Sequence, residues 1–407
     1  LNHRQPDRVP VDFGSTAVTG IHVSAVARLR KAVLGDESYR VKVTEPYQML
    51  GEIDDELRKV LGIDVVGIPA RKTMFGFENK GWKPFSLFDG TDVQVPEDFN
   101  IRRDENGDIV IYPEGDMTVP PSGRMPKGGL FFDSIVRQEP VDDEKLDPAD
   151  NLEEFGTLGE EDLSYYRRMI DRWGKTELGI TLTMPGTAFG DIALVPGPWM
   201  KHPKGIRDIE EWYISTVARK DYVLKVFQKQ CEIAIGNIKR LIGVLGNRVD
   251  ATFITGTDFG TQRGPFISKD AYRELYKPFH VAVNKFIHEN TTWKTFIHSC
   301  GSVYTLIPEF IEAGFDILNP VQCSAAEMEP RRLKKEFGKH VTFWGGGVNT
   351  QQTLPFGTPD EVYREVRERI EIFADGGGFV FDAIHNVQGN TPVENLMAMF
   401  RAIKESL

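Results

Sequence analysis

Phe296-Ile297-His298-Ser299-Cys300-Gly301-Ser302 is the stretch around which the rest of the chain can be interpreted. It continues a short apolar run from Trp293 that is typical of a β-strand, and residues 303–314 then carry apolar side chains at helical spacing. Ligands of α/β proteins bind where strands end and helices begin. Because His298 and Cys300 are two residues apart, both side chains leave the same face of a continuing strand. An imidazole and a thiolate there can hold a borderline-soft cation such as zinc.

The same pair of residues also has a purely structural interpretation. A small free cysteine is commonly buried in a core, and a histidine beside a turn commonly bonds a neighbouring group. The His-x-Cys spacing alone does not separate the two interpretations, so the choice depends on the rest of the chain.

Composition excludes several classes of partner. The chain has 407 residues and a net charge of −11, with no basic block, which argues against nucleic acid and acidic membrane surfaces as partners. Its three cysteines are widely spaced, which indicates a reducing compartment rather than a disulfide framework. No apolar run approaches the ~18 residues of a membrane span. We therefore expect a cytoplasmic protein.

Short apolar segments alternate with helical patterns over most of the chain. This alternation predicts an α/β fold, a (β/α)8 TIM barrel formed as one domain by residues 1–407. An open doubly wound sheet is the alternative, but no G-x-G-x-x-G follows an early strand, so a dinucleotide site is not supported. The eight predicted strands are Val9–Phe13, Ile63–Ile68, Ile180–Met184, Ala251–Thr255, Trp293–Ile297, Asp316–Asn319, Val341–Trp344 and Phe379–Asp382.

Residues 76–133 interrupt this alternation. They are rich in Gly, Pro and Asp, and Glu105-Asn106-Gly107-Asp108 lies between two strand-like segments, Phe99–Arg103 and Ile109–Tyr112. We expect an inserted antiparallel β subdomain, centred on this N-terminal hairpin, that covers one end of the barrel. Just upstream, Tyr47–Leu61 is expected to be helical.

A barrel brings together residues that follow different strands, however far apart they are in sequence. His385 lies a few residues past the last predicted strand, so it is the candidate third metal ligand beside His298 and Cys300. A catalytic zinc needs three protein ligands and an open fourth position. His385 could instead be a loop histidine bonded to a backbone carbonyl. Cys323 competes for the role of third ligand, although it is as readily packed beneath its loop.

Other residues at the strand ends are candidates for the chemistry. Asp258 follows its strand by three residues and could hold a substrate hydroxyl or a ligating histidine, or bond the N–H groups of its own loop. Four further residues are candidates for substrate binding: Gln262, Trp344, Asn349 and Asn386. For Trp344, packing in the core is the alternative role.

Several of these stretches together resemble the uroporphyrinogen decarboxylase superfamily, and more closely its cobamide-dependent methyltransferase branch. The resemblance covers nearly all of residues 245–407 and the N-terminal dozen. The stretches that carry it are Pro6–Phe13, Asp258–Ser268, His298–Ser302, Glu312–Pro320, Trp344–Thr350 and Thr391–Leu396.

The resemblance implies a (β/α)8 barrel and, in the methyltransferases, a zinc ion held by His-x-Cys and a later Cys after the last strand. His298 and Cys300 match the first two ligands. At the third position, counted back from Thr391-Pro392, this chain has His385. The ligand set is thus His/Cys/His, or it includes Asp258 or Cys323. The Arg-Gln-Ala-Gly-Arg signature of the decarboxylase itself is not found in the chain.

The expected function is therefore a zinc-dependent transfer of a methyl group between a small methylated compound (a methyl ether, amine or thiol) and the cobalt of a corrinoid. No segment resembles a cobalamin-binding domain, so the corrinoid would be supplied by a partner protein. Asp258, His298 and Cys300 are the expected catalytic residues. The alternatives are a metal-free decarboxylase or lyase in which Asp258 handles a proton, and a non-catalytic binding protein. A homodimer is compatible with the sequence.

Overall fold

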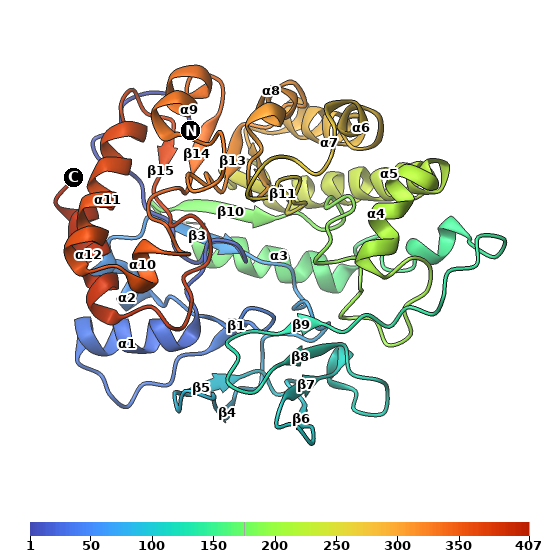
Figure 1. Ribbon diagram of the computed structural model, residues 1–407, viewed down its shortest axis with the longest axis horizontal. Coiled ribbons are helices and arrows are strands. Elements are labelled where there is room, and N and C mark those ends of the chain that lie inside the picture. Colours follow the sequence, from blue (N-terminus) through green and yellow to red (C-terminus); the bar gives the residue numbers. More distant parts are fainter. Residues whose placement is uncertain (175, 407) are drawn as a thin grey trace.

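A curled parallel β-sheet forms the centre of the molecule. A computed structural model describes residues 1–174 and 176–406 (Figure 1). Within these residues, seven strands pair in parallel in the order β15-β14-β13-β12-β11-β10-β3. The architecture is thus α/β and TIM-like, as expected. The strands are β3 (Val65–Ile68), β10 (Gly179–Thr183), β11 (Ala251–Thr255), β12 (Lys294–His298), β13 (Ile317–Asn319), β14 (Thr342–Trp344) and β15 (Phe379–Val380).

The eighth predicted strand, Val9–Phe13, is not a regular strand, and the barrel is not fully closed. The segment lies between the two outer strands of the sheet. On one side, Phe381 N–H donates to Pro10 O at 2.8 Å next to an isolated parallel bridge at Val11; on the other, Asp64 N–H donates to Val11 O at 2.8 Å. Pro10 has no N–H to donate, so a regular ladder cannot extend through it.

Helices surround the sheet on its outer side, and the two chain ends lie on the same side of the molecule (Figure 1). No helix in the described ranges has both the length and the apolar composition needed to cross a membrane. The α-helices are α1 (Val23–Leu34), α2 (Asp55–Leu61), α3 (Glu160–Trp173), α4 (Ile209–Ala218), α5 (Lys220–Leu245), α6 (Lys269–Leu275), α7 (Lys277–Asn290), α8 (Ile307–Glu312), α9 (Pro330–Phe337), α10 (Thr353–Phe356), α11 (Pro359–Phe373) and α12 (Val393–Lys404).

The helix predicted at Tyr47–Leu61 is wrong over its first half. Leu50 and Gly51 form β2 (Leu50–Gly51), which pairs antiparallel with β1 (Val43–Glu45). The helix begins only at Asp55, where the Asp54 side chain caps it by accepting the Leu57 N–H. An N-cap places its own backbone outside the helix, so the helix begins eight residues later than predicted.

The predicted antiparallel insertion is present. β4 (Lys83–Ser86) pairs with β5 (Asp92–Val95), and β6 (Ile101–Arg103), β7 (Ile109–Ile111), β8 (Gly123–Met125) and β9 (Asp133–Ser134) form a second antiparallel sheet. The predicted hairpin is confirmed, with Arg103 opposite Ile109 and Gly107 at a positive φ of 83°. These strands lie together at the bottom of Figure 1, below α3. That they cover one end of the barrel stays a prediction.

The interior of the curled sheet is apolar at one end and polar at the other. One residue from each of six strands forms an apolar cluster that is separate from the main core: Val65, Ala251, Phe296, Ile317, Trp344 and Val380. Two residues further along three of these strands stand His298, Asn319 and Asp382, which side-chain alternation places on the same interior face. The carboxyl ends of the strands therefore enclose a polar layer above an apolar plug.

A buried carboxylate ties α8 to α6 and α7, just after the loop that carries Cys300. Glu309 is 2% exposed and accepts hydrogen bonds from Arg273 Nη2 at 2.6 Å and from Lys277 Nζ at 2.8 Å. The hydrogen bond from Arg273 and then the one from Lys277 lower the pKa of Glu309 to about 2. Burial acts in the opposite direction, because it favours the neutral carboxyl group.

We expect Glu309→Gln to be less stable than the wild type at pH 7 by about 1–3 kcal/mol, because both cations lose their buried partner. Since the pKa of Glu309 is lowered on folding, its contribution is present above pH 4.5 and is lost as the pH falls toward 2. The two unfolding curves should therefore converge in that acid range. Urea unfolding across the pH series measures the difference.

Glu312→Gln is the matched control for this prediction. Its carboxylate pairs with the same Lys277 but is 63% exposed, so its removal should change stability at pH 7 by less than about 1 kcal/mol. A constant gap between wild type and Glu309→Gln from pH 7 to pH 3 would contradict the assignment.

Candidate functional site

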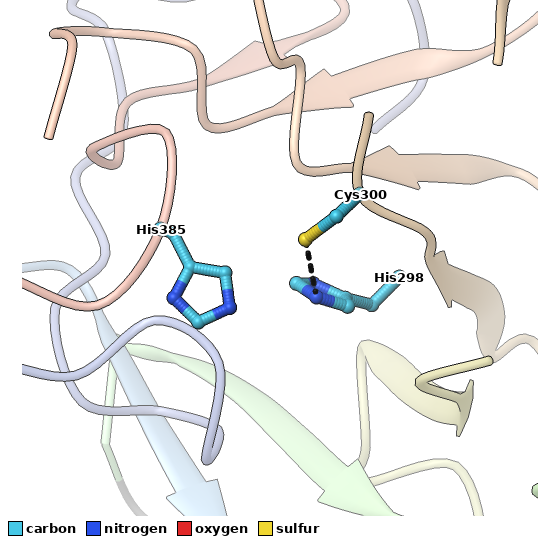
Figure 2. A group of neighbouring side chains, drawn as sticks. All are labelled: His298, Cys300 and His385. Atoms are coloured by element: carbon cyan, nitrogen blue, oxygen red, sulfur yellow. Dashed lines mark hydrogen bonds between the residues drawn. The ribbon is translucent and has the colours of Figure 1, made fainter. Parts of the chain in front are cut away.

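Two histidines and a cysteine converge at the carboxyl ends of the strands. His298 is the last residue of β12, Cys300 follows it by two residues, and His385 lies in the loop after β15. One ligand atom from each residue lies within 4.8 Å of the others, and Figure 2 shows the three side chains turned toward a common centre. Cys300 Sγ is 3.3 Å from His298 Nε2, and the two imidazole rings meet at 5.3 Å between centroids.

Asn319 fixes the protonation of His298. The Asn319 amide nitrogen donates to Trp344 O at 2.8 Å, so its oxygen must face the other way. That oxygen is 2.5 Å from His298 Nδ1, and an amide oxygen can only accept, so Nδ1 carries the hydrogen. The lone pair of His298 is consequently on Nε2, the atom that faces Cys300. This is the arrangement of a metal-binding histidine oriented by a second residue.

His385, unlike His298, has no ring nitrogen with a free lone pair. Its Nδ1 accepts the backbone N–H of Asn386 at 2.7 Å. In that arrangement Nδ1 has no free lone pair, and Nε2 carries the hydrogen of the neutral ring. Either nitrogen of His385 can bind a metal only if the contact with Asn386 is given up. His298 therefore presents a free lone pair, whereas His385 has to give up its contact with Asn386 before it can bind a cation.

Burial sets the charge of the three candidate ligands. Desolvation lowers the pKa of His298 to about 4, and it lowers that of His385 to about 4 with help from the neighbouring His298. Both imidazoles are thus neutral at pH 7, which is the state that ligates metals. Burial, and then the charge of Asp258, raises the pKa of the Cys300 thiol well above its usual range. A nearby cation is what would stabilise the thiolate.

Two buried carboxyl groups lie beside the triad. Asp258, in the loop after β11, accepts the Cys300 backbone N–H at 2.6 Å. Asp191, in the loop after β10, is 8% exposed and accepts the Ala193 N–H at 3.0 Å. Burial raises the pKa of Asp191 to about 7, with a further contribution from the charge of Asp258, and burial also raises the pKa of Asp258. This bond to the loop that carries the cysteine is none of the three roles considered for Asp258 in the sequence, and its part in the chemistry stays a prediction.

A second carboxyl pair occupies the polar layer inside the sheet. The bridge between Val11 and Phe381 places Asp12 and Asp382 side by side on neighbouring segments. Asp12 accepts Ser15 Oγ at 2.7 Å and Trp344 Nε1 at 3.0 Å, whereas Oδ2 of the buried Asp382 has no partner among the described residues. Burial, and then the charge of Asp12, raises the pKa of Asp382 well above its usual range. Asp12 is therefore the better placed of the two to ionise.

The four residues predicted to bind substrate lie apart from the triad or already have partners within the protein. Gln262 is on an exposed turn, and Trp344 is buried in the interior cluster. The Asn349 oxygen accepts two backbone N–H groups of the following turn. The Asn386 amide bonds the N-terminal segment, including the N–H of Gly20 at 2.6 Å. Substrate contact by these four residues stays a prediction.

Cys323 does not join the triad. It lies near Glu365 and Arg369 of α11, and burial raises the pKa of its thiol to about 12. Asn319, Asp191 and Asp382 are the site residues that the sequence analysis did not single out. Asn319 ends β13 as His298 ends β12, and Asp382 ends the strand predicted at Phe379–Asp382, so the rule that selected His298 could have selected them too.

The chain was compared with known proteins after this geometry was established. No curated protein matches it in sequence. A solved structure described as a methyltransferase from Methanosarcina mazei has the same fold, with 18% identity, a TM-score of 0.52, and coverage of 98% of this chain and 94% of that one. The family model described as uroporphyrinogen decarboxylase (URO-D) matches residues 136–406, well over half of the chain. This protein therefore belongs to the uroporphyrinogen decarboxylase (URO-D) family.

Proposed function

We propose that this protein is a zinc-dependent methyltransferase that moves a methyl group between a small methylated ether, amine or thiol and the cobalt of a corrinoid protein. The observation that carries the proposal is the convergence of His298, Cys300 and His385 within 4.8 Å. The structural likeness to a protein described as a methyltransferase supports the choice of reaction. The corrinoid would arrive on a separate partner protein.

The donor atoms fit the proposed metal. One sulfur and two imidazole nitrogens are ligands that zinc accepts, and three protein ligands leave a fourth position for a substrate atom. His298 is already in the required tautomer because Asn319 accepts from its Nδ1. A zinc ion in this position would supply Lewis acidity, which stabilises negative charge on the heteroatom that loses or gains the methyl group.

The protein's own residues provide orientation and exclude water. Asn319 holds the His298 ring, and Asp258 holds the backbone of Cys300 through its N–H. The buried position of both histidines keeps their imidazoles neutral at pH 7. The three candidate ligands are therefore uncharged until a cation binds and stabilises the Cys300 thiolate.

A metal-free decarboxylase or lyase is the second candidate, because the family model that matches the chain is described as a decarboxylase. In that case the buried Asp258, whose pKa is raised by burial, would hold or move a proton. Zinc content separates the two candidates, since only the methyltransferase requires a metal ion.

We expect purified wild-type protein to hold about one zinc ion per chain, and His298→Ala and Cys300→Ala each to lower the zinc affinity at least about tenfold. Methyl transfer between cob(I)alamin and a panel of methylated ethers, amines and thiols should be lost with the metal. Elemental analysis and this turnover assay measure the two effects, and circular dichroism checks that the variants fold.

Cys323→Ala is the control, because this cysteine lies outside the triad and should leave zinc content unchanged. Full methyl transfer by zinc-free His298→Ala or Cys300→Ala protein would refute the proposed function. Wild-type protein that binds no zinc at all would favour the metal-free alternative.

A second prediction concerns Asn319, which touches His298 but is not a ligand. Asn319→Leu keeps the size of the side chain and removes the acceptor for Nδ1–H, so the imidazole loses its fixed tautomer and orientation. We expect zinc affinity, measured by competition with a chelator, to fall by about 10–100-fold. Asn319→Asp keeps the acceptor for Nδ1–H but loses the donor to Trp344 O, so it should recover only part of the affinity. Equal zinc affinities for wild type and Asn319→Leu would show that the amide has no such role.

A further inference from the structure

We propose that Gln322, in the loop after β13, is a positioning residue that holds the Cys300 thiol where it meets the metal. The proposal rests on the proposed function and deepens it. Asn319 orients the histidine of the His-x-Cys pair, and Gln322 orients the cysteine. Gln322 contributes no ligand atom, so it acts on the metal through Cys300 alone.

The segment that carries Cys300 is tied to its neighbours through its backbone. Every backbone N–H from Ser299 to Ser302 donates to an oxygen outside the segment. The four acceptors, in chain order of the donors, are Asn319 O at 2.7 Å, Asp258 Oδ1 at 2.6 Å, Gln322 Oε1 at 2.7 Å and Thr261 O at 2.8 Å. They belong to the loop after β11 and to the end of β13 with its loop. Two neighbouring loops therefore hold the backbone on either side of the cysteine.

The peptide between Cys300 and Gly301 is held at both of its polar ends. Cys300 O lies 2.5 Å from the position that a Cβ on Gly260 would occupy, and a Cβ on Gly301 would lie 2.5 Å from the Gly260 carbonyl carbon. Glycine at both positions is what allows these backbones to approach so closely. In a trans peptide the N–H points away from the carbonyl. The Gly301 N–H consequently faces Gln322, on the side opposite Gly260.

The bond from Gly301 to Gln322 is shielded from water. Gln322 is 5% exposed and Gly301 is buried. A buried N–H that loses its acceptor pays the full desolvation cost of the group. Without the Gln322 oxygen, the peptide would turn to find another partner, and the Cα–Cβ bond of Cys300 would turn with it. The position of the sulfur therefore depends on this amide oxygen.

A metal site is sensitive to such a displacement. Cys300 Sγ is 3.3 Å from His298 Nε2, so a cation bound by both atoms has a narrow choice of positions. Zinc requires about 2.3 Å to sulfur and about 2.0 Å to nitrogen. Groups that orient a ligand without binding the metal typically change metal affinity by about 10–100-fold. We place Gln322 in this class.

One strand end orients both residues of the His-x-Cys pair. Asn319 is the last residue of β13, and Gln322 follows it by three residues. The backbone of Gln322 is itself fixed, because its carbonyl accepts the Ala325 N–H at 2.9 Å. Within residues 1–174 and 176–406, the hydrogen bond with Gly301 is the one that the Gln322 side chain makes. A substitution that keeps an oxygen at this place therefore loses no other bond.

Two variants of the full chain test the proposal. Gln322→Met keeps the length of the side chain and removes the acceptor, whereas Gln322→Glu keeps both. We expect zinc affinity, measured by competition with a chelator, to fall at least about tenfold in Gln322→Met and to stay within about threefold of wild type in Gln322→Glu. The control is Gln228→Met on the exposed side of α5, which should bind zinc as wild type does.

Cobalt(II) in place of zinc reports the position of the sulfur directly. A cobalt ion bound by a thiolate shows a thiolate-to-cobalt charge-transfer band. At saturating cobalt, we expect this band to be weakened in Gln322→Met and unchanged in Gln322→Glu. A wild-type band in Gln322→Met, or an equal loss of affinity in Gln322→Glu, would assign the glutamine a merely structural role and overturn the proposal.

A readout without metal separates failure of the proposal from failure of the proposed function. If wild type holds zinc and transfers methyl groups while Gln322→Met matches its affinity and spectrum, the proposal fails and the proposed function stands. If wild type binds neither zinc nor cobalt, the proposed function fails, and the rate at which iodoacetamide modifies Cys300, located by peptide mass, decides on Gln322. A rate at least about threefold higher in Gln322→Met than in wild type and Gln322→Glu upholds the positioning of the thiol, and equal rates overturn it.

Discussion

The site depends on one amide group. Asn319 donates to the carbonyl of Trp344 and accepts from His298, so both ends of its side chain are used and it cannot rotate without losing two buried hydrogen bonds. This fixes which nitrogen of His298 is free, and it turns that nitrogen toward Cys300. Trp344 continues the network from its indole to Asp12. The orientation of His298 is thus set by residues inside the sheet, whereas Cys300 and His385 lie in the loops at its mouth.

The strands explain how a polar network can exist inside the sheet. Alternate residues of each strand face the interior, so Phe296, Ile317 and Val380 fill its lower part and His298, Asn319 and Asp382 follow in the next layer. The apolar plug excludes water from below, which raises the cost of charge in the layer above it. This burial is the largest cause of the raised pKa of Asp382 and of the lowered pKa of His298.

The difference between the two histidines has a consequence for metal binding. His298 is oriented by the sheet, whereas His385 belongs to a loop and uses its Nδ1 to accept from Asn386. Asn386 also ties that loop to Gly20 and Ala17 of the N-terminal segment. Occupation of the third ligand position is therefore coupled to the contact between the last loop of the sheet and the segment that nearly closes it. A cysteine at this position would bind a metal through its sulfur alone, without a ring nitrogen that also accepts the Asn386 N–H.

The sequence by itself determined the parallel α/β architecture, the antiparallel hairpin and the positions of His298, Cys300 and His385, because strand periodicity, turn chemistry and strand ends are local properties. It did not show that Val9–Phe13 fails to form a regular strand, nor that the chain before Asp54 pairs as β1 and β2. Only the tertiary structure decided which polar groups are free. Asn349 and Asn386 stand where substrate amides would be expected, yet their hydrogen bonds go to the protein. Asp191 and Asp382 carry no local motif, and no Lys or Arg of the described ranges forms an ion pair with either. A side chain's partners come from segments distant in sequence, so its availability for a ligand is a property of the folded chain.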